Sequence, residues 1–230
     1  MGFLGPAEWQ AVFLSAKVAF WATLFMAPVA LFTAYALVRW EFPGKAIVNG
    51  LAHLPLILPP VVTGYLLLVV FGTQGFIGQH LKELGIVLAF RWSGAALAAA
   101  VMAFPLMLRA LRLSLEAVDQ RLEQAAATLG ASPVRVFTTV TLPLMLPGLL
   151  TGGILAFAKA LGEFGATITF VGNIPGQTQT IPSAIYALLQ VPGAEASVGR
   201  MVLLSVLIAL LALFLSEVFA RRMQRRLDGL

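Results

Sequence analysis

Long apolar stretches separated by short polar segments dominate the pattern of this chain. A helix needs roughly 20 apolar residues to cross a bilayer, because each residue adds about 1.5 Å against about 30 Å of hydrocarbon. The pattern therefore predicts an all-α, polytopic membrane protein with a single domain over residues 1–230. We expect about five spans, namely Val12–Val38, Ile47–Phe71, Trp92–Leu108, Leu142–Leu161 and Met201–Ala220.

A further apolar segment, Ile181–Val191, is too short to cross. As a helix it would reach only about 16 Å. Making it a sixth span would also move the arginine-rich tail to the other side of the membrane. We therefore expect a re-entrant or interfacial piece with Pro182 and Pro192 near its ends.

Composition supports a membrane protein over a water-soluble one. Hydrophobic residues make up 60% of the chain and charged residues only 11%, whereas soluble domains carry about 25% charged residues. The net charge is +5. The basic residues lie at the ends of apolar runs instead of forming a stripe, which argues against nucleic-acid binding. The absence of cysteine excludes thiolate metal sites and cysteine nucleophiles.

The distribution of basic residues predicts the orientation. Loops on the cytoplasmic side carry an excess of lysine and arginine. With five spans, three basic regions fall on the same side, and we expect the N-terminus outside and the C-terminus inside. These regions contain Arg39 and Lys45, then Arg109, Arg112, Arg121 and Arg135, then Arg221, Arg222, Arg225 and Arg226. The opposite loops contain Lys82, Arg91 and Arg200.

The longest cytoplasmic connection, residues 109–141, has a helical pattern of its own. Its first half lacks helix breakers, and Gly130 is a typical C-terminal stop. Ser132 and Pro133 are typical of the N-cap and first position of another helix. We therefore expect a helix, a tight turn and a second short helix. The small residues Ala125 and Ala126 would let another protein approach closely. The alternative is an ordinary connector, since alanine is the best helix former.

This connection resembles the cytoplasmic signature loop of ATP-binding-cassette importer permeases, which reads Glu-Ala-Ala, three residues, Gly, nine residues, Ile-x-Leu-Pro. Gly130 is followed after nine residues by Val140-Thr141-Leu142-Pro143, with valine replacing isoleucine. Gln124 stands where the family has glutamate, and Glu123 lies one residue earlier, so the residue making the polar contact is open. The resemblance assigns ATPase coupling to Glu123, Gln124, Ala125, Ala126, Gly130, Ser132, Leu142 and Pro143.

In that family the loop forms a coupling helix that docks on a separate ATPase and moves with its nucleotide-driven closure. The chain itself has no phosphate-binding loop of the form Gly-x-x-x-x-Gly-Lys-[Ser/Thr]. Its Gly44-Lys45 pair is preceded by Arg39 at the required first position and followed by Ala46. We therefore expect a non-catalytic subunit without a cofactor of its own, with ATP and magnesium bound by the partner.

Two stretches within the spans contain residues unusual for plain anchors. The first carries several prolines up to Pro60, and broken helices mark binding sites in transporters, although prolines also simply bend helices. The second contains Lys159 and Glu163, either a neutralising i,i+4 ion pair or functional charges. Candidate residues of a translocation path are Pro59, Pro60, Thr63, Gly64, Glu163, Gly165 and Thr167.

The two stretches resemble the molybdate branch of these permeases, through Leu-Pro-Leu-Ile-Leu-Pro-Pro-Val-Val at 54–62 and Gly-Glu-Phe-Gly-Ala-Thr at 162–167. Sulfate permeases match less well. The resemblance implies a multi-pass protein of the bacterial inner membrane that imports molybdate or tungstate by alternating access. It also implies a homodimer, two ATPase subunits and a periplasmic oxyanion-binding protein as partners. The alternative within the superfamily is a sulfate or thiosulfate permease.

Three other classes of function fit less well. An ion-coupled secondary transporter would need an intramembrane charge relay and usually an inverted repeat, and neither is evident. An intramembrane enzyme finds no support, because the sequence lacks His-Glu-x-x-His and its histidines are His53 and His80. We therefore expect no catalytic residue and no metal site. A passive anchor is disfavoured by the proline-rich second span.

Overall fold

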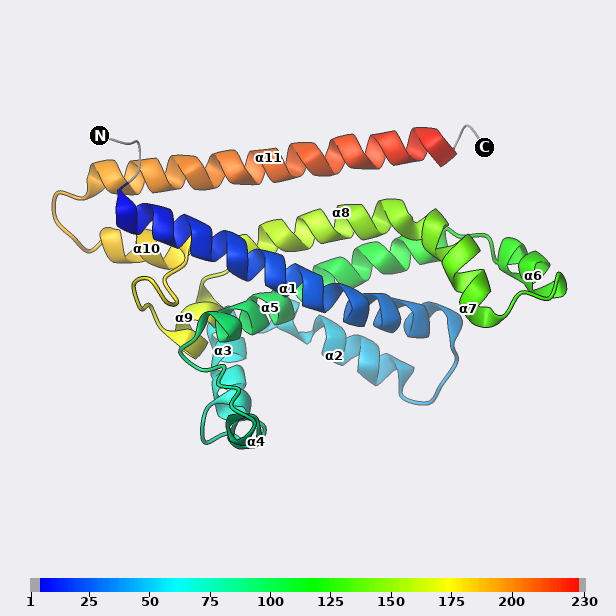
Figure 1. Ribbon diagram of the computed structural model, residues 1–230, viewed down its shortest axis with the longest axis horizontal. Coiled ribbons are helices and arrows are strands. Elements are labelled where there is room, and N and C mark those ends of the chain that lie inside the picture. The colour runs from blue at the N-terminus through cyan, green and yellow to red at the C-terminus, as the bar shows by residue number, and fades with distance from the viewer. Residues whose placement is uncertain (1–4, 228–230) are drawn as a thin grey trace.

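The computed structural model describes residues 5–227, and over that range the chain is built of helices and connecting loops (Figure 1). This confirms the expected all-α class. The helices are, in chain order, α1 Pro6–Arg39, α2 Lys45–Ile57, α3 Pro60–Phe71, α4 Gly78–Glu83, α5 Trp92–Glu116, α6 Gln120–Thr128, α7 Pro133–Val136, the π-helical turn η1 Phe137–Thr141, α8 Leu142–Leu161, α9 Gly165–Val171, α10 Ile181–Leu188 and α11 Glu195–Leu227.

Among residues 5–227, 4 helical stretches are long and apolar enough to cross a membrane, and up to 5 if the bent pair of α2 and α3 counts as one. The stretches are α1, α5, the continuous run Pro133–Leu161 and α11 as far as Phe219. The number agrees with the five spans expected from the sequence. The helices extend beyond the predicted apolar cores, because the polar residues at their ends include good helix formers such as arginine and glutamate.

The second expected span is broken at its prolines. α2 and α3 are bent by 118° relative to one another at Leu58–Pro59. A residue that precedes proline is pushed toward extended backbone, and both Leu58 (ψ 142°) and Pro59 (ψ 136°) have that conformation. Two consecutive prolines thus end one helix and start the next, so this is a break and not merely a bend.

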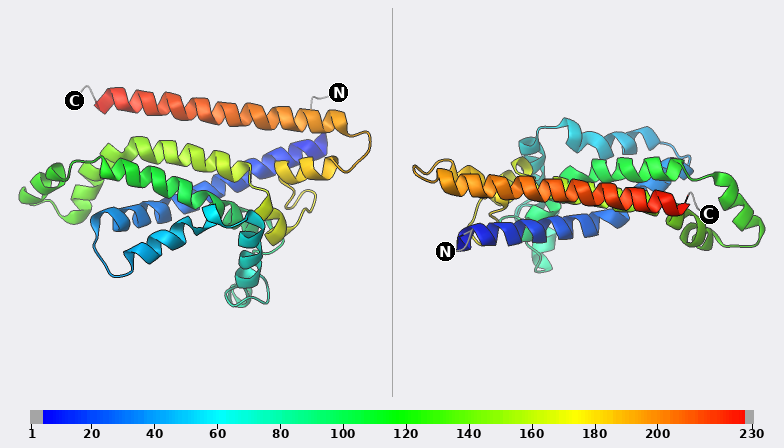
Figure 2. Two further views of the ribbon diagram at one scale, coloured as in Figure 1. Left: turned by 180° about the vertical axis from the view of Figure 1, so that it is seen from behind. Right: turned by 90° about the horizontal axis from the view of Figure 1, so that it is seen from above.

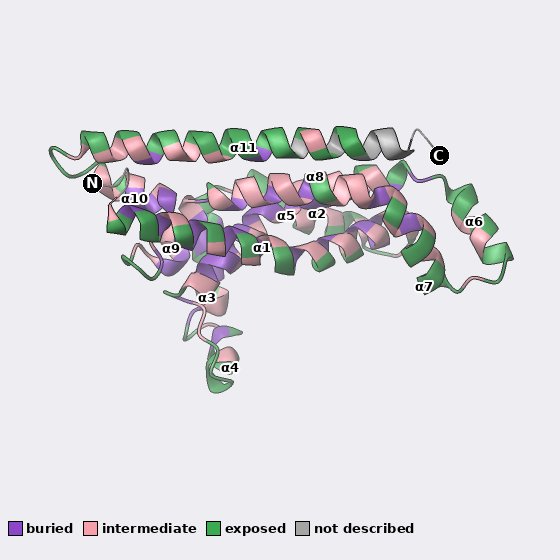
Figure 3. Ribbon diagram, turned by 45° about the horizontal axis from the view of Figure 1, so that its top comes forward, coloured by how far each residue is buried: buried purple, intermediate pink, exposed green. Residues whose placement is uncertain are grey.

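The core lies between α1, α5 and α8 and is built largely of small side chains. Fully buried alanines recur along both α1 and α5, as in Ala19, Ala30, Ala98 and Ala103. Small residues at a helix interface let the backbones approach closely, which is how membrane helices gain packing contacts without help from the hydrophobic effect. Figure 3 shows the buried residues concentrated where these helices meet.

α11 lies along the outside of this bundle, and many of its large apolar side chains are exposed (Figure 3). Leu203, Leu207, Leu210 and Phe214 are each at least half exposed. An ion pair of 3.1 Å between Glu8 Oε1 and Arg200 Nη2 ties the second turn of α11 to the start of α1. The exposed apolar surface suits contact with lipid or with another membrane-embedded protein.

The two ends of the bundle differ in what they carry. The 40–44 loop, α6, α7 and the far end of α11 lie together at one end, and the start of α1, α10 and the start of α11 lie at the other (Figures 1 and 2). The three basic regions therefore share one end, as the five-span topology requires.

The segment Ile181–Val191 contains the eight-residue helix α10, whose Ile181 amide donates to Ser15 Oγ at 2.7 Å.

Candidate functional site

The loop singled out by the sequence is a helix, a turn and another helix, with bounds that differ from the predicted 109–141. α5 continues through Arg109 to Glu116, because no breaker stands in that segment. α6 then starts after Asp119, whose side chain accepts a hydrogen bond from the Arg121 amide at 2.9 Å. The second helix is not short, since α7 continues through η1 into α8 without interruption.

The turn between α6 and α7 has the geometry expected from Gly130 and Ser132. Gly130 has φ +84°, the left-handed conformation that favours glycine. The Ala131 amide donates to the Ala126 carbonyl and the Gly130 amide to the Ala127 carbonyl, which is a Schellman motif. Ser132 Oγ accepts from the Arg135 amide at 3.4 Å and caps the next helix. These local signals end α6 and start α7 within a few residues of one another.

This loop lies at the end of the bundle, and its outward surface carries apolar side chains. Leu129 is 89% exposed and Val134 73% exposed, and Leu122 is also exposed. α6 has no buried residue along its length, and Ala125 presents a small exposed surface beside these side chains. Apolar side chains gathered at an exposed helical end mark a surface that another protein can cover.

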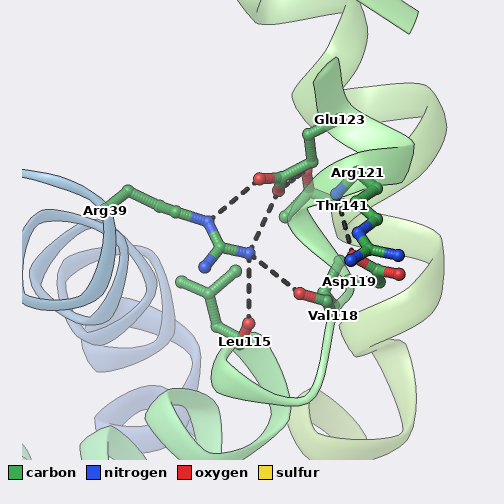
Figure 4. A network of polar contacts seen from close by, with 7 residues as sticks. All are labelled: Arg39, Leu115, Val118, Asp119, Arg121, Glu123 and Thr141. Carbon is green, nitrogen blue, oxygen red and sulfur yellow. Dashed lines mark hydrogen bonds and ion pairs between the residues drawn. The ribbon is translucent and has the colours of Figure 1, made fainter. Parts of the chain in front are cut away.

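Glu123 and Gln124 face different ways, which bears on the register left open by the sequence. The Glu123 carboxylate turns back to the bundle, where it pairs with Arg39 at 3.0 Å and accepts a hydrogen bond from Thr141 Oγ1 at 2.6 Å (Figure 4). Gln124 is exposed on the outside of α6. Glu123 is thus engaged within the chain, and Gln124 is the one free to meet a partner.

The remaining predicted coupling residues have different environments. Ala126 is half-buried on α6, and Leu142 is half-buried against the core at the start of α8. Pro143 is exposed and directly follows the π-helical turn. Proline inside a helix removes a donor and crowds the carbonyl four residues earlier. The wider turn of η1 accommodates that proline, so Leu142 and Pro143 belong to the joint with the span and not to the outward surface.

The two stretches within the spans meet where their helices are broken. α3 packs on α9 so closely that a Cβ built on Gly64 would lie 2.5 Å from the Ala166 carbonyl oxygen. A Cβ on Gly165 would likewise lie 2.7 Å from the Pro60 Cβ. Glycine is therefore required at both positions for this contact. The structure brings Pro60 and Gly64 together with Gly165, which lies about a hundred residues later in the sequence.

Glu163 and Thr167 hold the break between α8 and α9. Glu163 is buried, and its carboxylate lies 2.7 Å from Lys159 Nζ and accepts from the Ala166 amide at 3.1 Å. Thr167 Oγ1 donates to the carbonyls of Phe164 and Glu163. The neutralising ion pair considered from the sequence is therefore present, and both side chains have partners within the chain.

Two further path candidates lie on α3 and at its start. Thr63 is buried against the bundle, and no protein hydrogen-bond partner for its Oγ1 lies among the described residues. Pro59 is exposed at the break. Within residues 5–227 no group of three or more His, Asp or Glu side chains is placed to hold a metal ion.

Sequence reasoning missed the role of Arg39, which it counted only as a cytoplasmic charge. The Arg39 side chain is 9% exposed and contacts two carbonyls at the end of α5 as well as Glu123 on α6. Nothing in the local sequence around Arg39 signals this contact, because its partners follow 76 to 84 residues later.

A bundle of membrane-crossing helices, with two broken helices packed on one another and an exposed helical loop at one end, is the arrangement of a transport permease. The family model for binding-protein-dependent transport system inner membrane components matches residues 26–228. The chain belongs to this family and is a multi-pass protein of the inner membrane.

Relatives align along almost the whole chain. The molybdenum transport system permease protein ModB of Escherichia coli (strain K12) is 59% identical over 224 residues, covering 97% of this chain and 98% of the relative. The protein of the same name from Mycobacterium tuberculosis is 41% identical, covering 90% and 78%. A probable sulfate transport system permease protein, cysT of Nephroselmis olivacea, is 37% identical, covering 90% and 74%.

Solved structures with the same fold are much more distant in sequence. A bacterial ABC transporter for import of the acidic polysaccharide alginate matches with TM-score 0.74 and 17% identity, covering 96% of this chain and 81% of that chain. The inward-facing MetNI methionine ABC transporter matches with TM-score 0.67 and 16% identity, covering 94% of each chain. At these identities the likeness concerns the fold alone.

Proposed function

We propose that this chain is the membrane permease subunit of an ATP-driven importer and that molybdate is its cargo. The observation that carries the proposal is the exposed helix–turn–helix formed by α6 and α7. Its Schellman turn, capped second helix and outward Leu129 make a rigid, apolar protrusion at one end of the spans. Such a surface can enter a groove of a partner and move as a unit with it.

The partner that drives the movement is a separate ATPase. The chain has no sequence that cradles a phosphate, and Lys45 of the Gly44-Lys45 pair contacts Glu41 on the surface at 2.8 Å. We assign ATP and magnesium to two ATPase subunits and no cofactor or catalytic residue to this chain. The solved structures with the same fold are of ABC transporters, which supports a membrane subunit that depends on a separate ATPase.

The proposed orientation places α6 and α7 in the cytoplasm, where ATP is available. The basic residues at the same end, among them Arg39, Arg112 and Arg221, agree with the excess of positive charge on cytoplasmic loops. The opposite end, with the start of α1 and α10, then faces the periplasmic oxyanion-binding protein. One solved structure of the same fold, a bacterial alginate ABC transporter, was determined in complex with a periplasmic protein.

We further propose that two copies of the chain form the transport unit and that it works by alternating access. The α3–α9 contact, where both helices are broken, is our candidate for the moving part of the path. Glu163 and Thr167 stabilise the neighbouring break between α8 and α9. The residues of the contact are Pro59, Pro60, Thr63, Gly64 and Gly165. A close glycine-mediated contact can separate and reform without large side chains in the way.

Molybdate is favoured over sulfate as cargo on the strength of the relatives. Identity to the molybdenum permease of Escherichia coli is 59%, against 37% for the probable sulfate permease. The two anions share charge and tetrahedral shape, and Lys159, the cation near the break, is already paired with Glu163. We therefore place most of the selection in the binding protein, and weak binding in the membrane allows release of the cargo.

Uptake into liposomes tests this proposal. The chain is reconstituted with its ATPase, the binding protein is added outside, and molybdate inside the vesicles is measured after ATP is supplied to the ATPase. We expect ATP-dependent accumulation of molybdate that excess sulfate does not suppress. Accumulation of sulfate without molybdate would overturn the assignment of molybdate as the cargo. Absence of ATP-dependent uptake of either anion would overturn the assignment of the chain to an importer.

A further inference from the structure

Arg39 is the last residue of α1, and its guanidinium is held by several acceptors at once (Figure 4). Its Nε lies 3.0 Å from Glu123 Oε2 as an ion pair, and the directed hydrogen bond to the carboxylate comes from Nη2, 3.3 Å from Glu123 Oε1. Nη2 also donates to the carbonyls of Leu115 at 3.2 Å and Val118 at 3.4 Å. The side chain is 9% exposed although it lies at the end of the bundle.

These acceptors belong to two different elements. Leu115 is in the last turn of α5, and its carbonyl also accepts a hydrogen bond from the Val118 amide at 3.3 Å in the turn that ends the helix. Val118 lies two residues beyond the end of α5, so both carbonyls stand where the regular bonds of the helix stop. A cation at such a helix end is also favoured by the helix dipole. Glu123 is on α6. Arg39 therefore joins the end of α1 to the end of α5 and to the proposed docking helix.

The same carboxylate reaches a third span through Thr141. Thr141 Oγ1 donates to Glu123 Oε1 at 2.6 Å, and Thr141 is buried at the last position of η1, where the π-helical turn passes into α8. Single π-helical turns are frequent at functional sites and mark places where a helix can change direction. Glu123 thus connects α6 to α1 and to this joint at the same time.

α6 has little else to attach it to the spans. It has no buried residue, Leu122 on the helix and Leu129 at its C-cap are exposed, and short turns at 117–119 and 129–132 join it to its neighbours. If those turns flexed, α6 could shift without moving the membrane helices. The hydrogen bond from Thr141 to the Glu123 carboxylate is short, at 2.6 Å, and together with the Arg39–Glu123 ion pair at 3.0 Å it resists such a shift.

We propose that Arg39, Glu123 and Thr141 form a latch that transmits displacement of α6 to α1, α5 and α8, with Arg39 as its positioning residue. The inference rests on the proposed function, in which α6 is moved by an ATPase. Arginine is required because its planar fork meets the carboxylate and the carbonyls together, whereas lysine offers a single compact charge. The latch thus acts in coupling and not in binding the ATPase.

Two conservative variants separate coupling from assembly. Arg39→Lys keeps the charge but loses the fork, and Thr141→Val keeps the shape but loses the donor. Lys45→Gln is the matched control, because Lys45 is a cation at the same end whose partner is the exposed Glu41. The complexes are reconstituted with the ATPase and a molybdate-loaded binding protein. Molybdate transported per ATP hydrolysed is measured together with the amount of ATPase that co-purifies.

We expect both variants to retain the ATPase and to hydrolyse ATP near the wild-type rate, while molybdate transported per ATP falls about fivefold or more. Lys45→Gln should match the wild type. A second measurement uses the absence of natural cysteine. The double variant Arg39→Cys, Glu123→Cys should be uncoupled when reduced, and a short bis-maleimide, which adds to both thiols, should restore most of the coupling.

Normal transport per ATP in Arg39→Lys and Thr141→Val would overturn the latch while leaving the proposed function intact. Loss of ATPase binding in both variants, and in the double cysteine variant with or without the crosslinker, would also overturn it, because the cluster would then serve only to fold the loop. A wild-type complex that transports no molybdate contradicts the proposed function, and this inference with it.

Discussion

Gly165 lies against Pro60 so closely that any Cβ at Gly165 would come within 2.7 Å of the proline ring. The contact joins the first residue of α9 to the first residue of α3, each just after a break in a membrane helix. No side chain larger than hydrogen fits between them. The packing of these two broken helices therefore depends on a glycine that has no conformational requirement of its own.

We predict that Gly165→Ala weakens this contact and impairs transport. Crowding of a well-packed site costs about 1–3 kcal/mol. The melting temperature of the purified chain in detergent and its transport rate should both fall. Gly153→Ala on α8 is the control, because a Cβ there meets nothing within 4 Å and alanine favours the helix. Equal melting temperatures for Gly165→Ala and the wild type would contradict the close packing described here.

Removing the charge of Glu163 should destabilise the break between α8 and α9. Glu163→Gln leaves Lys159 without its partner and weakens the cap on the Ala166 amide. Lost hydrogen bonds to a charged group cost about 2 kcal/mol. Thermal unfolding of the single variant is compared with that of Lys159→Met, Glu163→Gln, which removes both charges and should lose less stability. A double variant less stable than the single one would contradict this assignment.

Truncation of Leu129 should weaken ATPase binding without affecting the fold. The side chain is 89% exposed in the isolated chain, so Leu129→Ala should change the free energy of unfolding by less than about 0.5 kcal/mol. In the proposed complex the ATPase would bury Leu129, so the loss of this side chain should raise the Kd for the ATPase about tenfold. Phe76→Ala, at a residue 80% exposed but outside the loop, is the control. Similar Kd values for both variants would argue against the proposed docking surface.

Thiol labelling tests the orientation, since the natural chain has no cysteine. Glu41→Cys lies in the 40–44 loop at the end that carries α6, and Gln177→Cys lies in the exposed loop before α10 at the opposite end. A membrane-impermeant maleimide added outside spheroplasts should label Gln177→Cys alone. Labelling of Glu41→Cys under these conditions would reverse the topology.

Features set by neighbouring residues could be predicted from the sequence. The stop at Gly130 and the cap at Ser132 each follow from local backbone chemistry, and the structure has both. The prolines of the second span left a bend and a break as alternatives, and the structure has a break at Pro59. The length of the apolar stretches similarly predicted the number of spans. The prediction was wrong about the second helix of the loop, since nothing between Val136 and Leu142 stops it before the span.

Contacts between distant segments could not be predicted in this way. Arg39 and Glu123 are 84 residues apart, and their pairing depends on where α1 and α5 end relative to each other. The contact of Gly165 with Pro60 depends likewise on the bend of 118° between α2 and α3. The sequence left Glu123 and Gln124 as alternatives for the polar contact with a partner. The structure shows Glu123 paired with Arg39 and Gln124 exposed, and the contact itself stays a prediction.

The turn at Gly130 allows the central claim to be tested with an almost isosteric pair of variants. A Cβ at this position meets nothing within 4 Å, and both asparagine and aspartate tolerate the left-handed conformation. Gly130→Asn and Gly130→Asp therefore fold alike and differ mainly in charge. Only aspartate would place an unpaired charge in the proposed ATPase interface, where burial is costly.

The most direct measurement is ATP hydrolysis in liposomes by the chain co-purified with its ATPase, with and without molybdate-loaded binding protein. We predict stimulation by the loaded protein for the wild type and for Gly130→Asn, and loss of that stimulation for Gly130→Asp. Undiminished stimulation of Gly130→Asp would contradict coupling through this loop. Stimulation by a sulfate-loaded protein, with none by the molybdate-loaded one, would contradict the cargo.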